Sequence, residues 1–141
     1  MSIWFQEIDA DFTDKIPLKG LTNTLEISFT KIEGDSLYGK MPVTEKHLQP
    51  YGLLHGGATI ALGETLASVA AYLTLDPEVN RCVGQNIEAN HLRPVSTGTV
   101  YGCATLKHKG RRQQVWDVEI TDDHEKLISI QRITMAVIKP R

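Results

Sequence analysis

One segment dominates this chain: residues 58–72 form the only stretch long enough and apolar enough for a buried helix, and stretches of alternating apolar and polar residues surround it. A single helix among many strands is typical of an α+β domain rather than of repeated β-α-β units, so we predict a sheet wrapped around one helix. The chain contains no repeat or linker, and 1–141 is expected to be a single domain. The expected strands are a hairpin through residues 25–43 that turns at 33–36, then strands near 81–91, 97–108, 113–121 and 127–138, with turns at 109–111 and 122–124.

Charge and hydropathy narrow the classes of partner. The net charge is −2 and the pI is about 6.2, so we expect neither nucleic acid nor an anionic membrane to bind the chain. No apolar run approaches the ~20 residues of a membrane-spanning helix, and the first residues are acidic where a signal peptide needs bases. We therefore expect a cytoplasmic protein whose cysteines, Cys82 and Cys103, are reduced thiols.

The start of the predicted helix carries the pattern that most suggests chemistry. His55-Gly56-Gly57 opens the helix, and Glu64 lies in its otherwise apolar interior. A helix N-terminus presents free amide groups and a partial positive charge, and glycines leave room for a carbonyl to approach. Together with the carboxylate, these features predict an acyl-transfer site. Two other interpretations stay open: His55 caps the turn, or Glu64 is a structural acid paired with His91 or with an arginine.

The two sides of the predicted helix differ in side-chain size. The bulky side is expected to seal the sheet core, while the small side admits another backbone or reflects tight packing within one subunit. Ser68 follows Glu64 by one turn, so its hydroxyl is placed to hydrogen bond the carboxylate or a water beside it. The small side holds Gly57, Ala61, Glu64, Ser68 and Ala71, and the bulky side holds Leu62, Leu66, Val69 and Leu73.

Distance along the helix decides how such a site is assembled. Gly56 and Glu64 are eight residues apart, which corresponds to about 12 Å at ~1.5 Å per residue. That separation is too large for both groups to serve one carbonyl carbon. If two such helices pack antiparallel about a two-fold axis, Gly56 of one chain faces Glu64 of the other. We therefore predict a homodimer with shared active sites.

These residues resemble the hotdog-fold acyl-CoA thioesterases, especially those of the 4-hydroxybenzoyl-CoA, phenylacetate, enterobactin and menaquinone pathways. The resemblance spans roughly residues 37–138 and is strongest in His47-Leu-Gln-Pro-Tyr-Gly-Leu-Leu-His-Gly-Gly-Ala58 with Glu64. It implies a curved antiparallel sheet around a central helix, with dimers joined edge to edge and often paired into tetramers. The supporting segments are Val83-Gly84, residues 90–98, and Gly110-Arg111 before Trp116.

The same resemblance implies a role for each candidate residue. Glu64 would be the catalytic carboxylate, acting as general base on water or as nucleophile on the thioester carbonyl. Gln49 and His55 would polarise the thioester oxygen, the Gly56 amide would be the oxyanion donor, and Ser68 would hold the water. A thioester carbonyl is electrophilic and a thiolate leaves readily, so these groups suffice without a Ser-His-Asp triad.

Coenzyme A is a polyanion, and its phosphates need cationic or hydrogen-bonding partners. Residues 107–112 form the only dense basic patch, from which Arg111 is a candidate, although a solvated hairpin tip explains the patch equally well. His91 and Arg93 are further candidates because of their place in the resembling segment. We expect no cofactor, since coenzyme A is part of the substrate, and no metal, since the His and Cys residues lack paired ligand spacing.

The resemblance favours an aromatic acyl group, such as hydroxybenzoyl or dihydroxynaphthoyl, carried on coenzyme A, with an acyl carrier protein as the alternative carrier. A hydratase or dehydratase of the same fold is the alternative enzyme, and a non-catalytic acyl-CoA-binding dimer is the alternative outside catalysis. Glu64 argues against the latter, because a binding groove gains nothing from a carboxylate that faces a thioester. The missing Gly-x-Ser-x-Gly motif excludes an α/β-hydrolase.

Overall fold

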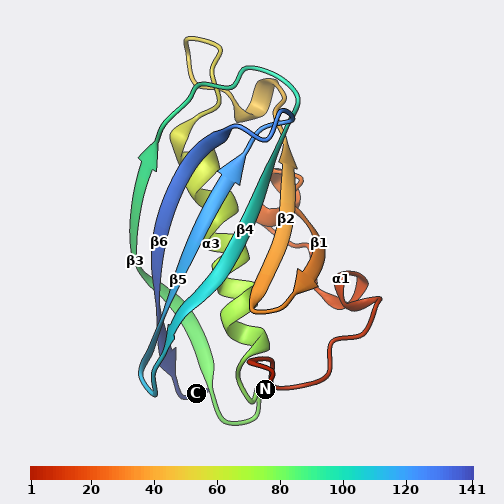
Figure 1. Cartoon of the computed structure of the whole chain (residues 1–141), viewed down its shortest axis with the longest axis vertical. Helices are drawn as coiled ribbons and strands as arrows, with labels where there is room; N and C mark the ends of the chain where they lie inside the picture. Colours follow the sequence, from red (N-terminus) through yellow and green to blue (C-terminus); the bar gives the residue numbers. More distant parts are fainter.

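The computed structural model describes residues 1–141 as one curved sheet around a long helix (Figure 1). Neighbouring strands are all antiparallel, in the order β1-β2-β4-β5-β6-β3. The predicted α+β hotdog architecture is confirmed. The elements are α1 (Phe12–Lys15), α2 (Leu21–Thr24), β1 (Ser28–Glu33), β2 (Ser36–Pro42), the 3-10 turn η1 (Glu45–His47), α3 (Gly56–Leu73), β3 (Arg81–His91), β4 (Thr99–Lys109), β5 (Gln113–Thr121) and β6 (Leu127–Ile138).

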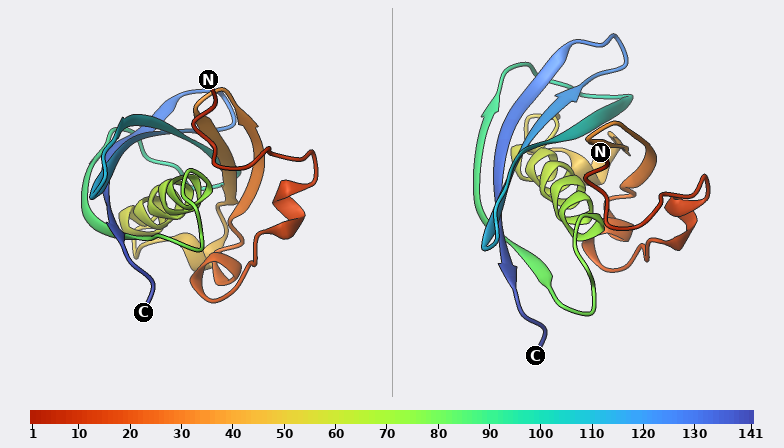
Figure 2. Two further views of the ribbon diagram at one scale, coloured as in Figure 1. Left: turned by 90° about the horizontal axis from the view of Figure 1, so that it is seen from below. Right: turned by 60° about the horizontal axis from the view of Figure 1, so that its bottom comes forward.

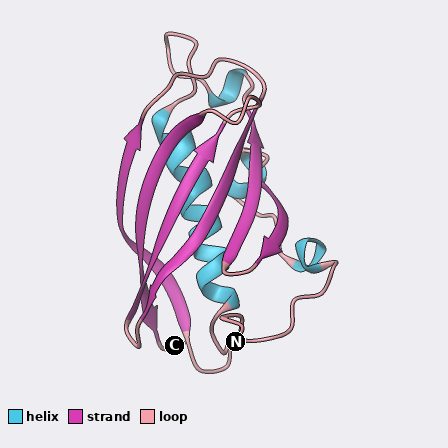
Figure 3. Ribbon diagram, in the orientation of Figure 1, coloured by secondary structure: helices cyan, strands magenta, loops and turns pink.

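Helix α3 lies against the concave face of the sheet, which curls around it when the molecule is viewed end-on (Figure 2). It is the one long helix among the strands (Figure 3). Leu66 is fully buried where Gly39 of β2 and Gly102 of β4 face each other, and a side chain at either glycine would collide with it. The two glycines therefore let the helix sit close to the middle of the sheet.

The buried face of α3 differs in part from the predicted one. Leu62 and Leu66 are fully buried as expected, whereas Val69 and Leu73 are only half-buried. Ala71, which was expected on the open side, is fully buried. The curved sheet approaches the helix so closely that small side chains fit beneath it better than large ones. The other small buried residues on this face are Thr59, Gly63, Ala67 and Ala70.

The chain before β2 also departs from the prediction. The hairpin is confirmed, but β1 begins at Ser28, so Leu25 and Ile27 do not belong to the strand. Glu26 adopts a positive φ of 57°, and the Leu25 carbonyl accepts a hydrogen bond from His47 Nε2 at 2.8 Å. The local backbone therefore turns to meet the loop before α3 instead of extending. The short helices α1, α2 and η1 were not predicted.

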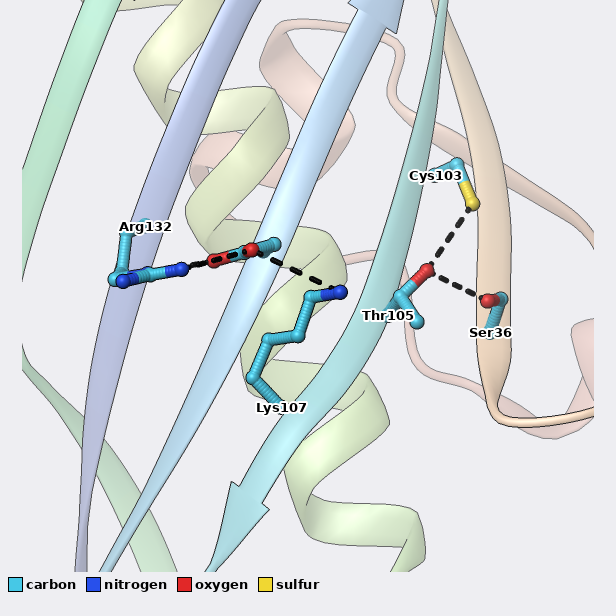
Figure 4. Close-up of polar contacts among 6 residues, drawn as sticks. Ser36, Cys103, Thr105, Lys107 and Arg132 are labelled. Atoms are coloured by element: carbon cyan, nitrogen blue, oxygen red, sulfur yellow. Dashed lines mark hydrogen bonds and ion pairs between the residues drawn. The ribbon is translucent and has the colours of Figure 1, made fainter.

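The convex face of the sheet is polar. Arg132 on β6 donates two hydrogen bonds to Asp117 on β5, at 2.7 and 3.0 Å, and these bonds hold the pKa of that carboxyl below its usual range. Ser36 and Thr105 share a hydroxyl hydrogen bond of 2.7 Å across β2 and β4 (Figure 4). No helix is long and apolar enough to cross a membrane.

Candidate functional site

The N-terminus of α3 leaves one backbone donor free. His55 is the N-cap residue: its Nδ1 accepts the Gly57 amide at 2.8 Å, and its carbonyl accepts the Ala58 amide at 3.0 Å. The His55 amide itself donates to the carbonyl of His47 at 2.8 Å. The Gly56 amide has no acceptor in the chain. His55 thus caps the turn through Nδ1, and the positive end of the helix presents the Gly56 N–H to an incoming oxygen.

Buried His47 holds the loop that precedes α3. The Thr44 amide donates to His47 Nδ1 at 3.1 Å, so Nε2 carries the ring proton and donates it to the Leu25 carbonyl at 2.8 Å. The ring therefore joins this loop to the N-terminal segment. His47 was not predicted to have a role, although the three-residue spacing of Thr44 and His47 is that of a capping box and could have indicated one.

Four of the predicted site residues line one cavity at this end of the helix. The cavity measures about 270 Å³ and includes Gln49, Gly56, His91 and Arg93 in its wall. The Gln49 side-chain oxygen accepts the Tyr51 amide at 2.5 Å, which leaves its NH₂ group free to donate to a ligand. The structure thus brings the free Gly56 amide and a side-chain amide donor together.

His91 lies directly against Gly56. A Cβ added at Gly56 would be only 2.8 Å from His91 Nε2, so no other residue fits there without moving the ring. His91 Nδ1 is 3.1 Å from the hydroxyl of Ser129 on β6. The ring is therefore fixed between the helix and the sheet, on the wall of the cavity.

Glu64 lies between α3 and the edge strand β3. A Cβ at Gly84 would overlap its Oε1, so the carboxylate rests on the backbone of β3 at that glycine. Gly84 borders an irregularity in the β3–β6 pairing, between Gly84 and Asn86. Glu64 has no hydrogen-bond or ion-pair partner within the chain, so the interpretation as a structural acid paired with His91 or an arginine is wrong for the isolated chain.

Ser68 does not hydrogen bond Glu64 in this chain. Its hydroxyl is 3.9 Å from the sulfur of Met135, and its carbonyl accepts the thiol of Cys82 at 3.7 Å. Burial raises the pKa of that thiol to about 11. No three His, Cys, Asp or Glu side chains converge in the chain as metal ligands would.

A second, larger cavity of about 710 Å³ begins at Ser68 and extends along the C-terminal half of α3. The N-terminal segment forms its other wall and is anchored by the Phe5 amide, which donates to the Leu73 carbonyl at 2.9 Å. The wall is mainly apolar and partly aromatic. It includes Phe5, Ile8, Phe12, Ile16, Val69, Tyr72 and Leu73, with Lys15 and Asp9 at the polar side.

Arg111 lies at the opposite end of the helix. It belongs to the β4–β5 turn, where Lys109 donates to the Thr74 carbonyl at 3.0 Å, just beyond the C-terminus of α3. The helix has 18 residues and is therefore about 27 Å long. Within one chain, Arg111 is thus not part of the site that holds His91 and Arg93.

The chain is similar in sequence and in fold to several known proteins. The sequence profile of the thioesterase superfamily matches residues 51–129. The 1,4-dihydroxy-2-naphthoyl-CoA hydrolase of Escherichia coli is 38% identical over 136 residues, which cover 96% of this chain and 99% of that protein. The proofreading thioesterase EntH of Cronobacter turicensis is 38% identical over 137 residues, or 96% and 98%. The crystal structure of a variant of thioesterase PA1618 from Pseudomonas aeruginosa superposes with a TM-score of 0.93 at 38% identity, covering 99% and 100%.

Proposed function

Since the chain belongs to the thioesterase superfamily, we propose that it hydrolyses an aromatic acyl-CoA thioester to the free acid and coenzyme A. The observation that carries this proposal is the Gly56 amide, left without an acceptor at the positive end of α3 while the neighbouring amides are bonded. A preorganised donor of this kind stabilises the oxyanion that forms when a thioester carbonyl is attacked. The name of the Escherichia coli relative supports an aromatic acyl group and coenzyme A as the carrier.

In the proposed reaction, the thioester oxygen lies at the Gly56 amide, with the Gln49 amide and His55 as further donors. Glu64 either removes a proton from the attacking water or attacks the carbonyl itself. The carbon–sulfur bond then breaks, and coenzyme A leaves as a thiolate that takes up a proton. Attack by water gives the free acid directly, whereas attack by Glu64 leaves an acyl–glutamyl anhydride that a water molecule must hydrolyse to release the acid and restore the carboxylate. No cofactor is needed, because the substrate supplies its own leaving group.

The distance between Gly56 and Glu64 supports a shared site. They are separated by about 12 Å along α3, so one chain does not place both on one carbonyl. Glu64 lies beside Gly84, in the first half of β3, whereas Gly56 lies beside His91 at the other end of that strand. A two-fold axis through the middle of β3 would bring one chain's Glu64 toward the other chain's Gly56.

The edge strand itself supports this dimer. β3 is an 11-residue edge strand without proline, most of its residues are exposed, and Val83 is 49% exposed. A long unprotected edge is a template for pairing with a second strand. Antiparallel pairing of two β3 strands about Asn86 would set Gly84 of the partner subunit opposite Glu88, in the half of the strand that leads to His91. Two such dimers would form the tetramer that the resemblance suggests.

The larger cavity is the proposed position of the acyl group. It starts at Ser68, one helical turn beyond Glu64, so a group whose carbonyl lies near the carboxylate extends into it. Its volume of about 710 Å³ and its Phe5, Phe12 and Tyr72 side chains suit a flat aromatic ring system. Arg93 and His91 at the other cavity remain the proposed contacts for coenzyme A, with Arg111 contributing only from a partner subunit.

The test compares 1,4-dihydroxy-2-naphthoyl-CoA, benzoyl-CoA and hexanoyl-CoA as substrates, with thiol release measured by a chromogenic disulfide. We expect thiol release, higher kcat/KM for the aromatic substrates, and a loss of about 10²–10⁴-fold in the Glu64→Gln variant with folding intact. A hydratase would instead change the absorbance of an enoyl-CoA without releasing thiol. Near-normal turnover by Glu64→Gln, or a fully active monomer in analytical ultracentrifugation, would reject the proposed site.

A further inference from the structure

A chain of hydrogen bonds runs from the first turn of α3, through the buried Gln131 and Ser129 side chains, to His91. Gln131 on β6 is only 4% exposed, and its Nε2 donates to the Thr59 carbonyl of α3 at 3.1 Å and to Ser129 Oγ at 3.3 Å. Ser129 Oγ is in turn 3.1 Å from His91 Nδ1. His91 Nε2 lies against Gly56 at the other side of the ring. The amide of Gln131 is thus connected, through one hydroxyl and one imidazole, to the end of the helix.

The oxygen of the same amide lacks a hydrogen-bond partner. Gln131 Oε1 is buried without a hydrogen-bond partner and points at Gly63, where any side chain would overlap it. An unpartnered buried oxygen and a glycine inside a helix both reduce stability, and an apolar side chain would avoid both. The amide cannot turn over, because its oxygen would then face the Thr59 carbonyl. We therefore attribute the presence of glutamine at position 131 to the hydrogen bonds that its Nε2 group donates to the Thr59 carbonyl and to Ser129 Oγ.

The donors and acceptors in this chain select one form of His91. Gln131 Nε2 can only donate, so Ser129 Oγ accepts from it. The hydroxyl proton of Ser129 has no other acceptor among the hydrogen bonds of the chain and is directed to His91 Nδ1. Nδ1 then accepts, and the ring proton is on Nε2, the nitrogen beside Gly56.

We propose that Gln131 and Ser129 are positioning residues that fix His91 as the Nε2–H tautomer and thereby hold a second hydrogen-bond donor beside the free Gly56 amide. This inference rests on the proposed thioesterase function, and it places the contact of His91 with the acyl-CoA at the thioester group rather than at the coenzyme A phosphates: the donor pair would meet the thioester oxygen as it gains negative charge. An Nδ1–H tautomer would present a lone pair at the same place and repel that oxygen. The effect belongs to the reacting state, so it acts on kcat more than on KM.

The test uses Ser129→Ala and Gln131→Leu, each with a matched control. Ser36→Ala removes a hydroxyl that also bonds across two strands, on the convex face. Gln114→Leu removes a fully buried amide that also links the sheet to α3, at Thr74 Oγ1 near the other end of the helix. We expect both site variants to lower kcat for an aromatic acyl-CoA by about 10- to 100-fold with little change in KM, and both controls to keep kcat within about two-fold.

The tautomer of His91 is read independently of activity from long-range ¹H–¹⁵N spectra of the imidazole rings, with the resonances assigned from a His91→Gln variant. We expect the Nε2–H form in the wild type and in both controls, a mixture of tautomers in Ser129→Ala, and recovery of the single form and of kcat in Ser129→Thr. An Nδ1–H ring in the wild type, or an unchanged ring in Ser129→Ala, would overturn the proposal. If the wild type released no thiol while the spectra behaved as expected, the proposed function would fail and the positioning of His91 would stand.

Discussion

The sharpest test of the candidate site is Gly84→Ala, because it acts on Glu64 without changing that residue. Gly84 does not have a positive φ, so alanine is compatible with its backbone. The added Cβ would overlap Glu64 Oε1, the far end of a flexible side chain, and the carboxylate must therefore move away from β3. Because only a side-chain end has to shift, the free energy of unfolding should change by no more than about 1 kcal/mol.

The effect on catalysis should be much larger. The added Cβ would be 2.1 Å from Oε1 and ordinary contact begins at 3.4 Å, so the carboxylate must retreat by more than 1 Å, and a displacement of about 1 Å already costs roughly 10²-fold in rate. This corresponds to about 2.7 kcal/mol of transition-state stabilisation. We expect Gly84→Ala to lower kcat for an aromatic acyl-CoA by about this factor while its melting temperature stays close to that of the wild type.

A double-mutant cycle supplies the control. If Gly84→Ala acts by displacing the carboxylate, it should cause no further loss in a Glu64→Gln background, and the coupling energy should equal nearly the whole effect. Equal losses in both backgrounds would mean that the alanine disturbs the strand or the dimer instead. A wild-type rate in the Gly84→Ala single variant would refute the contact between the Glu64 carboxylate and the backbone of β3 at Gly84.

Three further outcomes follow from the structure. His47→Ala should lower the free energy of unfolding by about 3 kcal/mol in urea titrations monitored by circular dichroism, because a buried ring with bonds at both nitrogens is lost. Since the pKa of Cys82 is about 11, roughly 10⁻³ of that thiol is ionised at pH 8, and iodoacetamide should modify it far more slowly than a free cysteine peptide. Asp117→Asn should be less stable than the wild type at pH 7. The stabilisation is fully present above the unfolded pKa of about 3.9 and is lost as the pH falls from that value through the lowered pKa of Asp117 in the folded chain, so the difference should shrink at low pH; thermal melts at pH 7 and pH 3 check this.

The strands and the long helix were predictable from sequence because each buries one face, and burial imposes a period of two or about 3.6 residues. Which face of α3 is buried against the sheet was less predictable. Side-chain size suggested that Val69 and Leu73 face the core, but Gly63 and Ala67 are the residues that are buried there, and Val69 and Leu73 are only half-buried. How closely a sheet curves around a helix depends on residues in other strands, such as Gly102, and is not contained in the pattern of the helix itself.

Contacts between distant segments account for most of what the sequence did not reveal. The Leu25 carbonyl is taken by His47, 22 residues later, which ends the extended backbone that alternation had suggested. Ser129 and Gln131 alternate with exposed neighbours along β6 and look like ordinary polar strand residues. Only the register of the sheet and the position of Gly63 opposite Gln131 show that both side chains point inward, where Ser129 meets His91.

Three glycines explain why the functional side chains are where they are. Gly56 admits the ring of His91, Gly63 admits the amide of Gln131, and Gly84 admits the carboxylate of Glu64; in each case a methyl group would collide with a polar atom of that side chain. A glycine in the interior of a helix or strand weakens it, so Gly63 and Gly84 each have a local cost that packing alone does not require. Two of the glycines are on the helix and one is on the edge strand β3, which pairs only with β6, at a distance from the free Gly56 amide that one chain does not bridge. Under the proposed function, these side chains form one catalytic surface only when β3 pairs with the β3 strand of a second copy of the chain. The strand against which the Glu64 carboxylate lies is also the edge strand that is left open for such pairing.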